Sequence, residues 1–211
     1  MIPNKNEWIK ALEERYGKEF KNKILSSTVA VCGLGGLGSN IAILLARAGV
    51  GKLILIDFDK VDITNLHRQQ YKACQIGMYK TEALACNLKE FAPYIKTVIH
   101  TARMNENNFH EILKDADVIC EAFDDAETKA ALVNFVLSEM PGKYIVAASG
   151  MAGLDSANTI HTRRISKCFY LCGDEKTDVT DGIGLVATRV SICASHQAHM
   201  VLRIISENFE E

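Results

Sequence analysis

Polar residues with phosphate-binding and metal-binding chemistry follow a glycine-rich segment of this chain. The segment is Gly33-Leu34-Gly35-Gly36-Leu37-Gly38, and the polar residues are Asp57, Asp59, Asn65, Arg68, Gln69, Lys80 and Asp124. Arg68 offers a bidentate fork to phosphate oxygens and Lys80 a mobile point charge, whereas Asp124 offers a carboxylate to the Mg²⁺ that bridges such oxygens. Cations of this kind stabilise the pentavalent transition state when a carboxylate is joined to AMP. The set therefore indicates a nucleotide whose phosphates are attacked.

The glycine-rich segment has the spacing of a nucleotide-binding turn. Gly33, Gly35 and Gly38 fill the template G-x-G-x-x-G, and Gly36 adds a further small residue. Glycines let the backbone turn tightly, and the helix that follows presents free N–H groups to anionic oxygen. Asp57 ends the next predicted strand, where a carboxylate accepts the ribose hydroxyl hydrogens and repels a 2′-phosphate, which disfavours NADP. The template alone does not distinguish NAD, FAD and ATP.

Each polar side chain also has a simpler explanation. Arg68 and Lys80 could be ordinary surface charges. Asp124 could cap the helix predicted just after it, because aspartate is a preferred N-cap residue, and capping would not exclude metal binding. Asp59 and Asp125 could be solvated neighbours of the functional carboxylates.

Apolar runs alternate with amphipathic segments through residue 148, which predicts the elements that position these side chains. Strands are predicted at residues 28–32, 52–57, 97–102, 118–122 and 144–148. Helices are predicted at residues 7–21, 39–48, 79–91, 106–114, 126–139 and 185–208, and a short antiparallel pair at 159–165 and 168–171. The alternation predicts an α/β fold, with a Rossmann-like, doubly wound and mainly parallel sheet, a short antiparallel extension and a long C-terminal helix. We expect a single nucleotide-binding domain over residues 1–211, with residues 1–27 as an N-terminal helical segment.

Composition favours a cytoplasmic protein without a membrane or nucleic-acid partner. The 211 residues carry a net charge of −2, so no overall positive field attracts nucleic acid or an anionic membrane surface. No apolar run reaches the roughly 18 residues of a membrane span, and the N-terminal sequence MIPNKNEWIKALEERYGKEF lacks the apolar core of a signal peptide. Seven cysteines are an odd number, which favours reduced thiols over a disulfide framework.

Five motifs, GLGGLGSN, LILIDFDKVDITNLHRQQ, GMYKTEA, EAFDDAETK and ASGMAG, occur in this order. Together they resemble the ThiF and MoeB family, adenylyltransferases that activate ubiquitin-like sulfur carriers and are related to the ubiquitin-activating enzymes. The resemblance implies that Gly35 lines an ATP site, that Asp57 holds the ribose and that Asp124 carries Mg²⁺. It also implies phosphate contacts from Asn65, Arg68, Gln69 and Lys80.

The resemblance extends to subunit organisation. It favours a homodimer, and Arg15 in EERYGKEF is similar in position to a family arginine that reaches the nucleotide of the neighbouring subunit. The segment between Arg15 and the first strand is shorter than is usual in the family.

The chain departs from many relatives in its cysteines. Those relatives bind zinc through two CxxC pairs, whereas this chain has one close pair, Cys168 and Cys172, which we expect to be small buried hydrophobes. Zinc is therefore not expected. Cys193, His196 and His199 are spaced three apart on the last predicted helix, where a core position is favoured over a metal site. The loop over residues 173–188 has no other cysteine, which predicts that the reaction stops at the acyl-adenylate.

The favoured function is ATP-dependent adenylylation of the C-terminal glycine carboxylate of a ubiquitin-like sulfur carrier that ends in Gly-Gly. The amino-acid sequence of the motifs is most similar to that of the short ThiF-type proteins of thiamine biosynthesis. Small residues over 147–153 are expected to line the channel of the carrier tail, and the polar stretch 176–184 could close over it. Other acceptors remain open: a molybdopterin sulfur carrier, a peptide or a tRNA base. An NAD-dependent oxidoreductase would have no use for the residues from Asn65 to Lys80, and a non-catalytic partner subunit would not need Arg68, Lys80 and Asp124 together.

Overall fold

The computed structural model of the chain describes residues 2–180 and 182–209; positions 1, 181, 210 and 211, one of them within the polar stretch 176–184, lie outside the described residues. The strands form a seven-stranded sheet in the order β3-β2-β1-β4-β5-β7-β6. Their bounds are β1 Thr28–Cys32, β2 Lys52–Ile56, β3 Lys96–His100, β4 Val118–Glu121, β5 Tyr144–Ala148, β6 His161–Ser166 and β7 Phe169–Gly173.

The sheet has the predicted doubly wound topology. The neighbouring pairs from β3 to β7 are parallel, and β6 pairs antiparallel with β7, as the sequence pattern predicted. The chain leaves β1 for β2 on one side and later returns to add β4 on the other. Connections therefore diverge at the carboxyl ends of β1 and β4, the place where open α/β sheets bind ligands.

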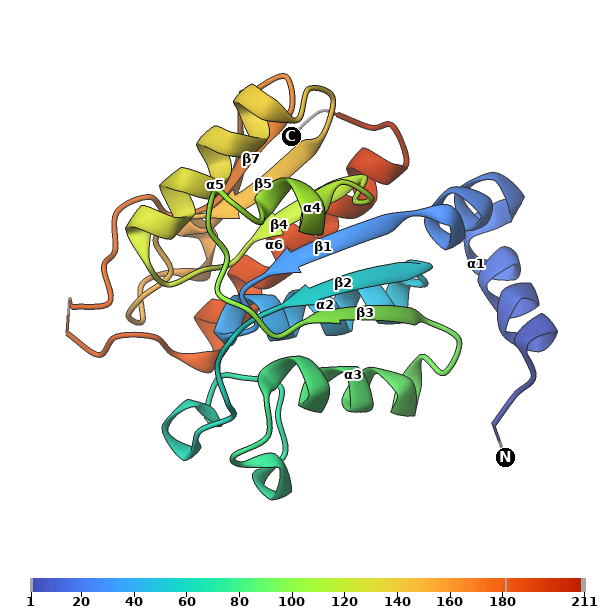
Figure 1. Cartoon of the computed structure of the whole chain (residues 1–211), viewed down its shortest axis with the longest axis horizontal. Coiled ribbons are helices and arrows are strands. Elements are labelled where there is room, and N and C mark those ends of the chain that lie inside the picture. Colours follow the sequence, from blue (N-terminus) through green and yellow to red (C-terminus); the bar gives the residue numbers. More distant parts are fainter. Residues whose placement is uncertain (1, 181, 210–211) are drawn as a thin grey trace.

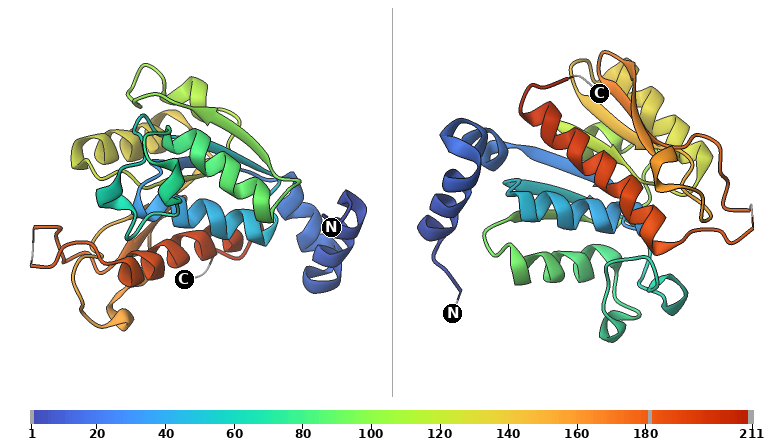
Figure 2. Two further views of the ribbon diagram at one scale, coloured as in Figure 1. Left: turned by 90° about the horizontal axis from the view of Figure 1, so that it is seen from below. Right: turned by 180° about the vertical axis from the view of Figure 1, so that it is seen from behind.

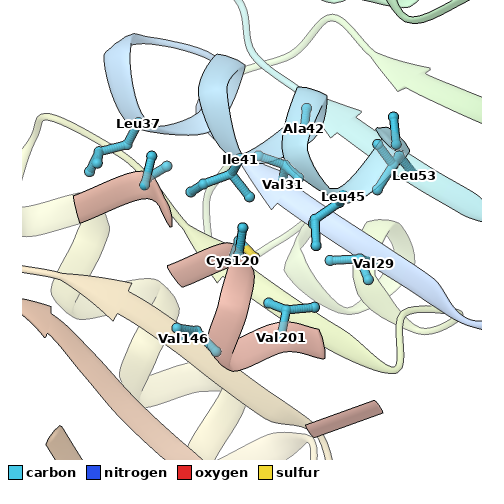
Figure 3. Packing of buried hydrophobic residues seen from close by; sticks show 14 of the residues in the cluster. Val29, Val31, Leu37, Ile41, Ala42, Leu45, Leu53, Cys120, Val146 and Val201 are labelled. Carbon is cyan, nitrogen blue, oxygen red and sulfur yellow. The ribbon is translucent and has the colours of Figure 1, made fainter. Parts of the chain in front are cut away.

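Helices cover both faces of the sheet (Figures 1 and 2). One face carries α2 Gly36–Ala48, α3 Lys80–Phe91 and α6 Ala187–Ile205, and the other carries α4 Phe109–Leu113 and α5 Ala126–Glu139. Strand alternation explains the two layers, because Val29 and Val31 of β1 belong to the first core and Ala30 and Cys32 to the second. Figure 3 shows the first core, in which α2 packs on the sheet and against α6.

The first helix, α1 Lys5–Ser26, extends from the body at the amino end of β1 (Figure 1). Asn4 caps it with a reciprocal capping box to Glu7, and Gly17 interrupts it with a φ of 76°. In the part of the chain that the structure describes, no helix has both the length and the apolar character needed to cross a bilayer.

Four predicted helices differ from the structure by more than one residue at an end. Helix α1 covers residues 5–26 rather than the predicted 7–21. Helix α2 begins at Gly36 rather than at residue 39, because the second half of the glycine segment is already helical. Helix α4 spans five residues instead of 106–114, since the side chains of Asn105 and Asn108 bond nearby backbone N–H groups and form a turn there. Helix α6 covers residues 187–205 of the predicted 185–208.

Candidate functional site

A cavity of about 520 Å³ opens at the carboxyl ends of the parallel strands. Four of these strands lead into segments of its lining: Gly33 follows β1, Asp57 follows β2, Asp124 lies beyond β4 and Ser149 follows β5. The cavity therefore lies at the topological switch point of the sheet.

The glycine segment forms one wall of this cavity. Gly33 has a φ of +90°, and a Cβ there would lie 2.6 Å from the Ala122 carbonyl oxygen. Gly33, Gly35 and Gly36 line the cavity, and the first turn of α2 begins there without a side-chain cap at Gly35. Its free N–H groups can accordingly bind an anion. Gly38 is not among the lining residues; a Cβ there would lie 1.8 Å from the Gly33 carbonyl oxygen, so this glycine permits close packing of helix on turn.

Asp57 is buried at the base of the cavity. Its Oδ2 accepts the Leu34 N–H at 2.7 Å and its Oδ1 accepts the Asp59 N–H at 2.7 Å. Burial raises the pKa of this carboxyl, while Lys80 and the two N–H groups act against the rise. Each carboxylate oxygen retains a further acceptor site, so the side chain can also accept two hydroxyl hydrogens.

Lys80 is 5% exposed, which excludes an ordinary surface charge. Its Nζ lies 2.8 Å from Asp59 Oδ2 and 3.9 Å from Asp57 Oδ2. The backbone holds this arrangement, because the Lys80 N–H donates to the Asp59 carbonyl and Lys60 forms a bridge with Tyr79. Asp59 is therefore the ion-pair partner of Lys80 rather than a solvated neighbour.

Arg68 and Gln69 bring unpaired polar atoms to the cavity. One terminal nitrogen of Arg68 donates to Asn65 Oδ1 at 2.9 Å, and all three residues line the cavity. Among the described residues, Arg68 Nε and Gln69 Oε1 are buried without a hydrogen-bond partner. Buried polar atoms are normally satisfied, so these two atoms are available to hydrogen-bond a ligand in the cavity.

Two α2 residues that the sequence did not single out hold this loop. Ser39 Oγ accepts the Gln70 N–H at 3.1 Å, and Asn40 donates to the Arg68 carbonyl and accepts from the Gln70 amide. The signal was available in GLGSN, since two hydrogen-bonding residues on a packed helix need partners.

Asp124 and Asp125 have different roles despite being neighbours. Asp125 is the N-cap of α5 and accepts the Thr128 N–H at 2.7 Å. Asp124 is exposed, lines the cavity and has no hydrogen bond or ion pair with another described residue. The capping explanation for Asp124 was therefore wrong, and the cap lies one residue later.

Ser149–Ala152 line the cavity after β5, together with Lys129 of α5. The sequence analysis did not single out Lys129, which lies within the motif EAFDDAETK. Lys129 Nζ lies 2.6 Å from Glu121 Oε2 and donates to the Ala148 carbonyl at 3.0 Å. Burial raises the pKa of the Glu121 carboxyl, and the Lys129 ammonium opposes this effect. The pair ties the ends of β4 and β5 to the first turn of α5.

The other candidate residues lie elsewhere. Arg15 is on α1, at the amino end of β1, and is not part of the cavity lining. Cys172 and Cys193 are buried, as expected, whereas Cys168 is half-buried and His199 is exposed. Within the described residues, no group of three His, Cys, Asp or Glu side chains could hold a metal ion.

The sequence of this chain is similar to those of known adenylyltransferases. The chain is 35% identical to the adenylyltransferase and sulfurtransferase MOCS3 of Caenorhabditis briggsae over 93% of its own length and 50% of that protein. It is 28% identical to the adenylyltransferase and sulfurtransferase UBA4 of Lodderomyces elongisporus, over 97% of the chain and 48% of that protein. The chain thus spans about half the length of the curated relatives it matches.

Solved structures share the fold. The Escherichia coli tRNA N6-threonylcarbamoyladenosine dehydratase TcdA, in complex with ATP, matches with a TM-score of 0.85 at 19% identity and covers 98% of both chains. Its complex with AMP matches with a TM-score of 0.84. The model of the ThiF family matches residues 10–211. The chain belongs to the ThiF family.

Proposed function

We propose that this chain uses ATP to adenylylate a carboxylate, with release of pyrophosphate. The observation that carries the proposal is the shared cavity, whose lining brings the glycine turn and Asp57 together with Arg68, Lys80 and Asp124. The names of the MOCS3 and UBA4 relatives support adenylyl transfer, and the ATP complex of TcdA supports ATP as the nucleotide.

The residues have complementary tasks in this reaction. Asp57 accepts the ribose hydroxyls, and the N–H groups at the start of α2 bind phosphate oxygen. The attacking carboxylate is ionised at neutral pH and needs no general base. Arg68 and Lys80 stabilise the charge that develops on the departing pyrophosphate, with Asn65 and Gln69 as neutral hydrogen-bonding partners. Catalysis is positioning combined with electrostatic stabilisation.

Asp124 fits a magnesium ion that arrives with the nucleotide. The side chain is exposed on the cavity wall and unpaired among the described residues, and Mg²⁺ typically takes one or two protein carboxylates together with phosphates and water. A single aspartate therefore suffices, although no three-residue cluster surrounds it. When bound, the ion would neutralise phosphate charge.

The acceptor in this proposal is a ubiquitin-like sulfur carrier with a C-terminal Gly-Gly. Ser149, Gly150 and Ala152 line the cavity with little side-chain volume, which suits an extended tail without side chains. The sequence favoured a carrier of thiamine biosynthesis, whereas the relatives reported above are named as MOCS3 and UBA4 sulfurtransferases. The choice of carrier is therefore left to experiment.

A homodimer completes the proposal. Helix α1 leads into the amino end of β1, so Arg15 is placed far from the cavity of its own chain. In the proposed dimer, Arg15 reaches the cavity of the neighbouring copy.

The test combines ATP–pyrophosphate exchange with mass measurement of each acceptor. The protein is incubated with ATP, Mg²⁺ and, in separate reactions, a thiamine-type carrier, a molybdopterin-type carrier and a tRNA transcript. We expect one carrier to gain the mass of AMP. Addition of AMP to tRNA alone would replace the carrier in the proposal, and absence of any adduct or exchange would refute adenylyl transfer.

Two adjacent variants control the experiment. Asp124→Asn removes the unpaired carboxylate and should lower exchange about a hundredfold or more. Asp125→Asn keeps a good N-cap and should change neither exchange nor stability by much. Equal exchange in the two variants would remove Asp124 from the mechanism.

A further inference from the structure

Arg189 is a buried arginine of α6 outside the nucleotide side of the cavity. Its side chain is 3% exposed, and one terminal nitrogen donates to the carbonyl oxygens of Asp155 and Ser156, both at 2.8 Å. The other terminal nitrogen donates to Thr159 Oγ1 at 2.9 Å and to the Asp174 carboxylate. One guanidinium thus joins two segments that are distant in sequence, residues 155–159 and the turn after β7.

Asp174 connects Arg189 to residues of the cavity wall. Its carboxylate is 5% exposed and accepts the N–H groups of Lys176 and Thr177, both at 2.9 Å. Burial raises the pKa of Asp174, but these N–H groups, the Thr177 hydroxyl and Arg189 outweigh it and lower the pKa to about 2. The carboxylate is therefore ionised throughout the neutral range, opposite a permanently charged guanidinium.

Thr177 completes the connection. Its Oγ1 accepts the Ala152 N–H at 3.0 Å, and both residues line the cavity. One residue later, the Gly153 N–H donates to the Gly184 carbonyl at 2.7 Å. The backbones are in close contact as well, because a Cβ on Gly150 would lie 2.0 Å from Asp174 Oδ1. Backbone hydrogen bonds to Cys172, Asp174 and Glu175 also hold Ser149 and Gly150. The chain Arg189, Asp174 and Thr177 adds the side-chain link to Ala152.

We propose that Arg189 and Asp174 are positioning residues for the acceptor: they fix residues 149–153 as the wall along which its carboxyl-terminal tail lies. The inference rests on the proposed adenylyl transfer and adds the residues that set acceptor affinity. The nucleotide side has side-chain bonds of its own, from Ser39, Asn40 and the Asp59–Lys80 pair. Helix α6 contacts this side through Val190 and Ser191 rather than through Arg189. We call the chain Arg189, Asp174 and Thr177 the clamp. Loss of the clamp therefore weakens acceptor binding and leaves nucleotide binding unchanged.

The decisive variants remove side-chain hydrogen bonds of Thr177 or Arg189: the Thr177 hydroxyl accepts the Ala152 N–H and donates to the Asp174 carboxylate. Thr177→Val keeps the shape of the side chain but cannot accept the Ala152 N–H, whereas Thr177→Ser retains the hydroxyl. Arg189→Lys keeps the charge but loses the planar fork that reaches both segments. Each variant is compared with the unmodified protein in carrier-dependent exchange, in equilibrium binding of ATP, and in hydrogen–deuterium exchange of the free protein.

We expect Thr177→Val to raise the KM for the carrier about three- to tenfold, because the hydroxyl's hydrogen bonds to Ala152 and Asp174 are lost together. ATP affinity should stay within about twofold of the unmodified protein, and Thr177→Ser should restore the KM. Arg189→Lys should produce a larger rise in KM. In both Thr177→Val and Arg189→Lys, peptides spanning residues 149–160 should exchange faster, while those of residues 28–48 should not.

Other outcomes overturn the inference or the function separately. An unchanged KM, or equal weakening of carrier and ATP, shows that the clamp does not position the acceptor. If the unmodified protein modifies no carrier, the proposed function fails. Hydrogen exchange then still decides whether the clamp orders residues 149–153, and unchanged exchange there would refute it.

Discussion

Asp57 shows how one side chain can organise both the fold and the ligand. Its carboxylate holds the turn through the Leu34 N–H and the following loop through the Asp59 N–H, beside the buried ammonium of Lys80. The remaining acceptor sites serve a ribose. Burial raises the pKa of this group, and its neighbours oppose the rise, so the charge that the site needs depends on those neighbours.

The raised pKa of Asp57 predicts a pH dependence for nucleotide binding. Asp57→Asn should weaken ATP binding about tenfold or more at neutral pH, because the amide cannot accept both hydroxyl hydrogens. As pH falls through a pKa above the ordinary 3.8, the native carboxyl becomes protonated, and the difference between the two proteins should shrink. Calorimetric titration of both proteins across this pH range gives the ratio of their ATP dissociation constants. Protonation of ATP itself affects both constants equally and cancels in this ratio. A ratio that stays constant down to pH 4 would contradict the ribose role or the shift.

At the scale of elements, features that depend on neighbouring residues could be predicted from the sequence, whereas those that depend on contacts between distant segments could not. The β1–turn–α2 unit and Asp57 follow from residues 28–57, because the glycine turn, the helix and the strand that follows are adjacent in sequence. The Asp124 cap was misassigned, since aspartates at two successive positions can both cap a helix and only geometry chooses Asp125. The Arg189 clamp was not predictable, because its partners lie 15 to 34 residues away in loops without a periodic signal.

The glycine turn yields a prediction that separates packing from binding. Gly38→Ala should destabilise the protein by about 2–3 kcal/mol or more, because the new Cβ would lie 1.8 Å from a backbone oxygen. Gly35→Ala has space, with its nearest neighbour 3.8 Å away, and should leave stability nearly unchanged while its methyl group obstructs the phosphate cradle. Urea unfolding and ATP titration of both variants test this contrast. A stable Gly38→Ala protein, or a Gly35→Ala protein with native ATP affinity, would show that the roles are misassigned.

At the scale of the whole molecule, the cavity and the first helix lie at opposite ends of the sheet. The cavity is at the carboxyl ends of the strands, and α1 projects from the amino end of β1 with most of its surface exposed (Figure 2). Arg15, which this exposed helix carries, is not among the residues that line the cavity of its own chain. The proposed homodimer gives Arg15 a function, if each α1 serves the cavity of the other subunit.

Complementation between two defective variants tests this arrangement. Arg15→Ala and Asp124→Asn should each lose most carrier-dependent exchange. If Arg15 acts on the neighbouring subunit, a mixed dimer has one intact cavity, with Asp124 from one chain and Arg15 from the other. Random mixing of equal amounts would then restore about a quarter of the unmodified activity, because half of the dimers are mixed and each has one intact site of two. No recovery after verified subunit exchange, or a monomer in analytical ultracentrifugation at the assay concentration, would exclude a shared site and leave Arg15 as a surface residue of α1.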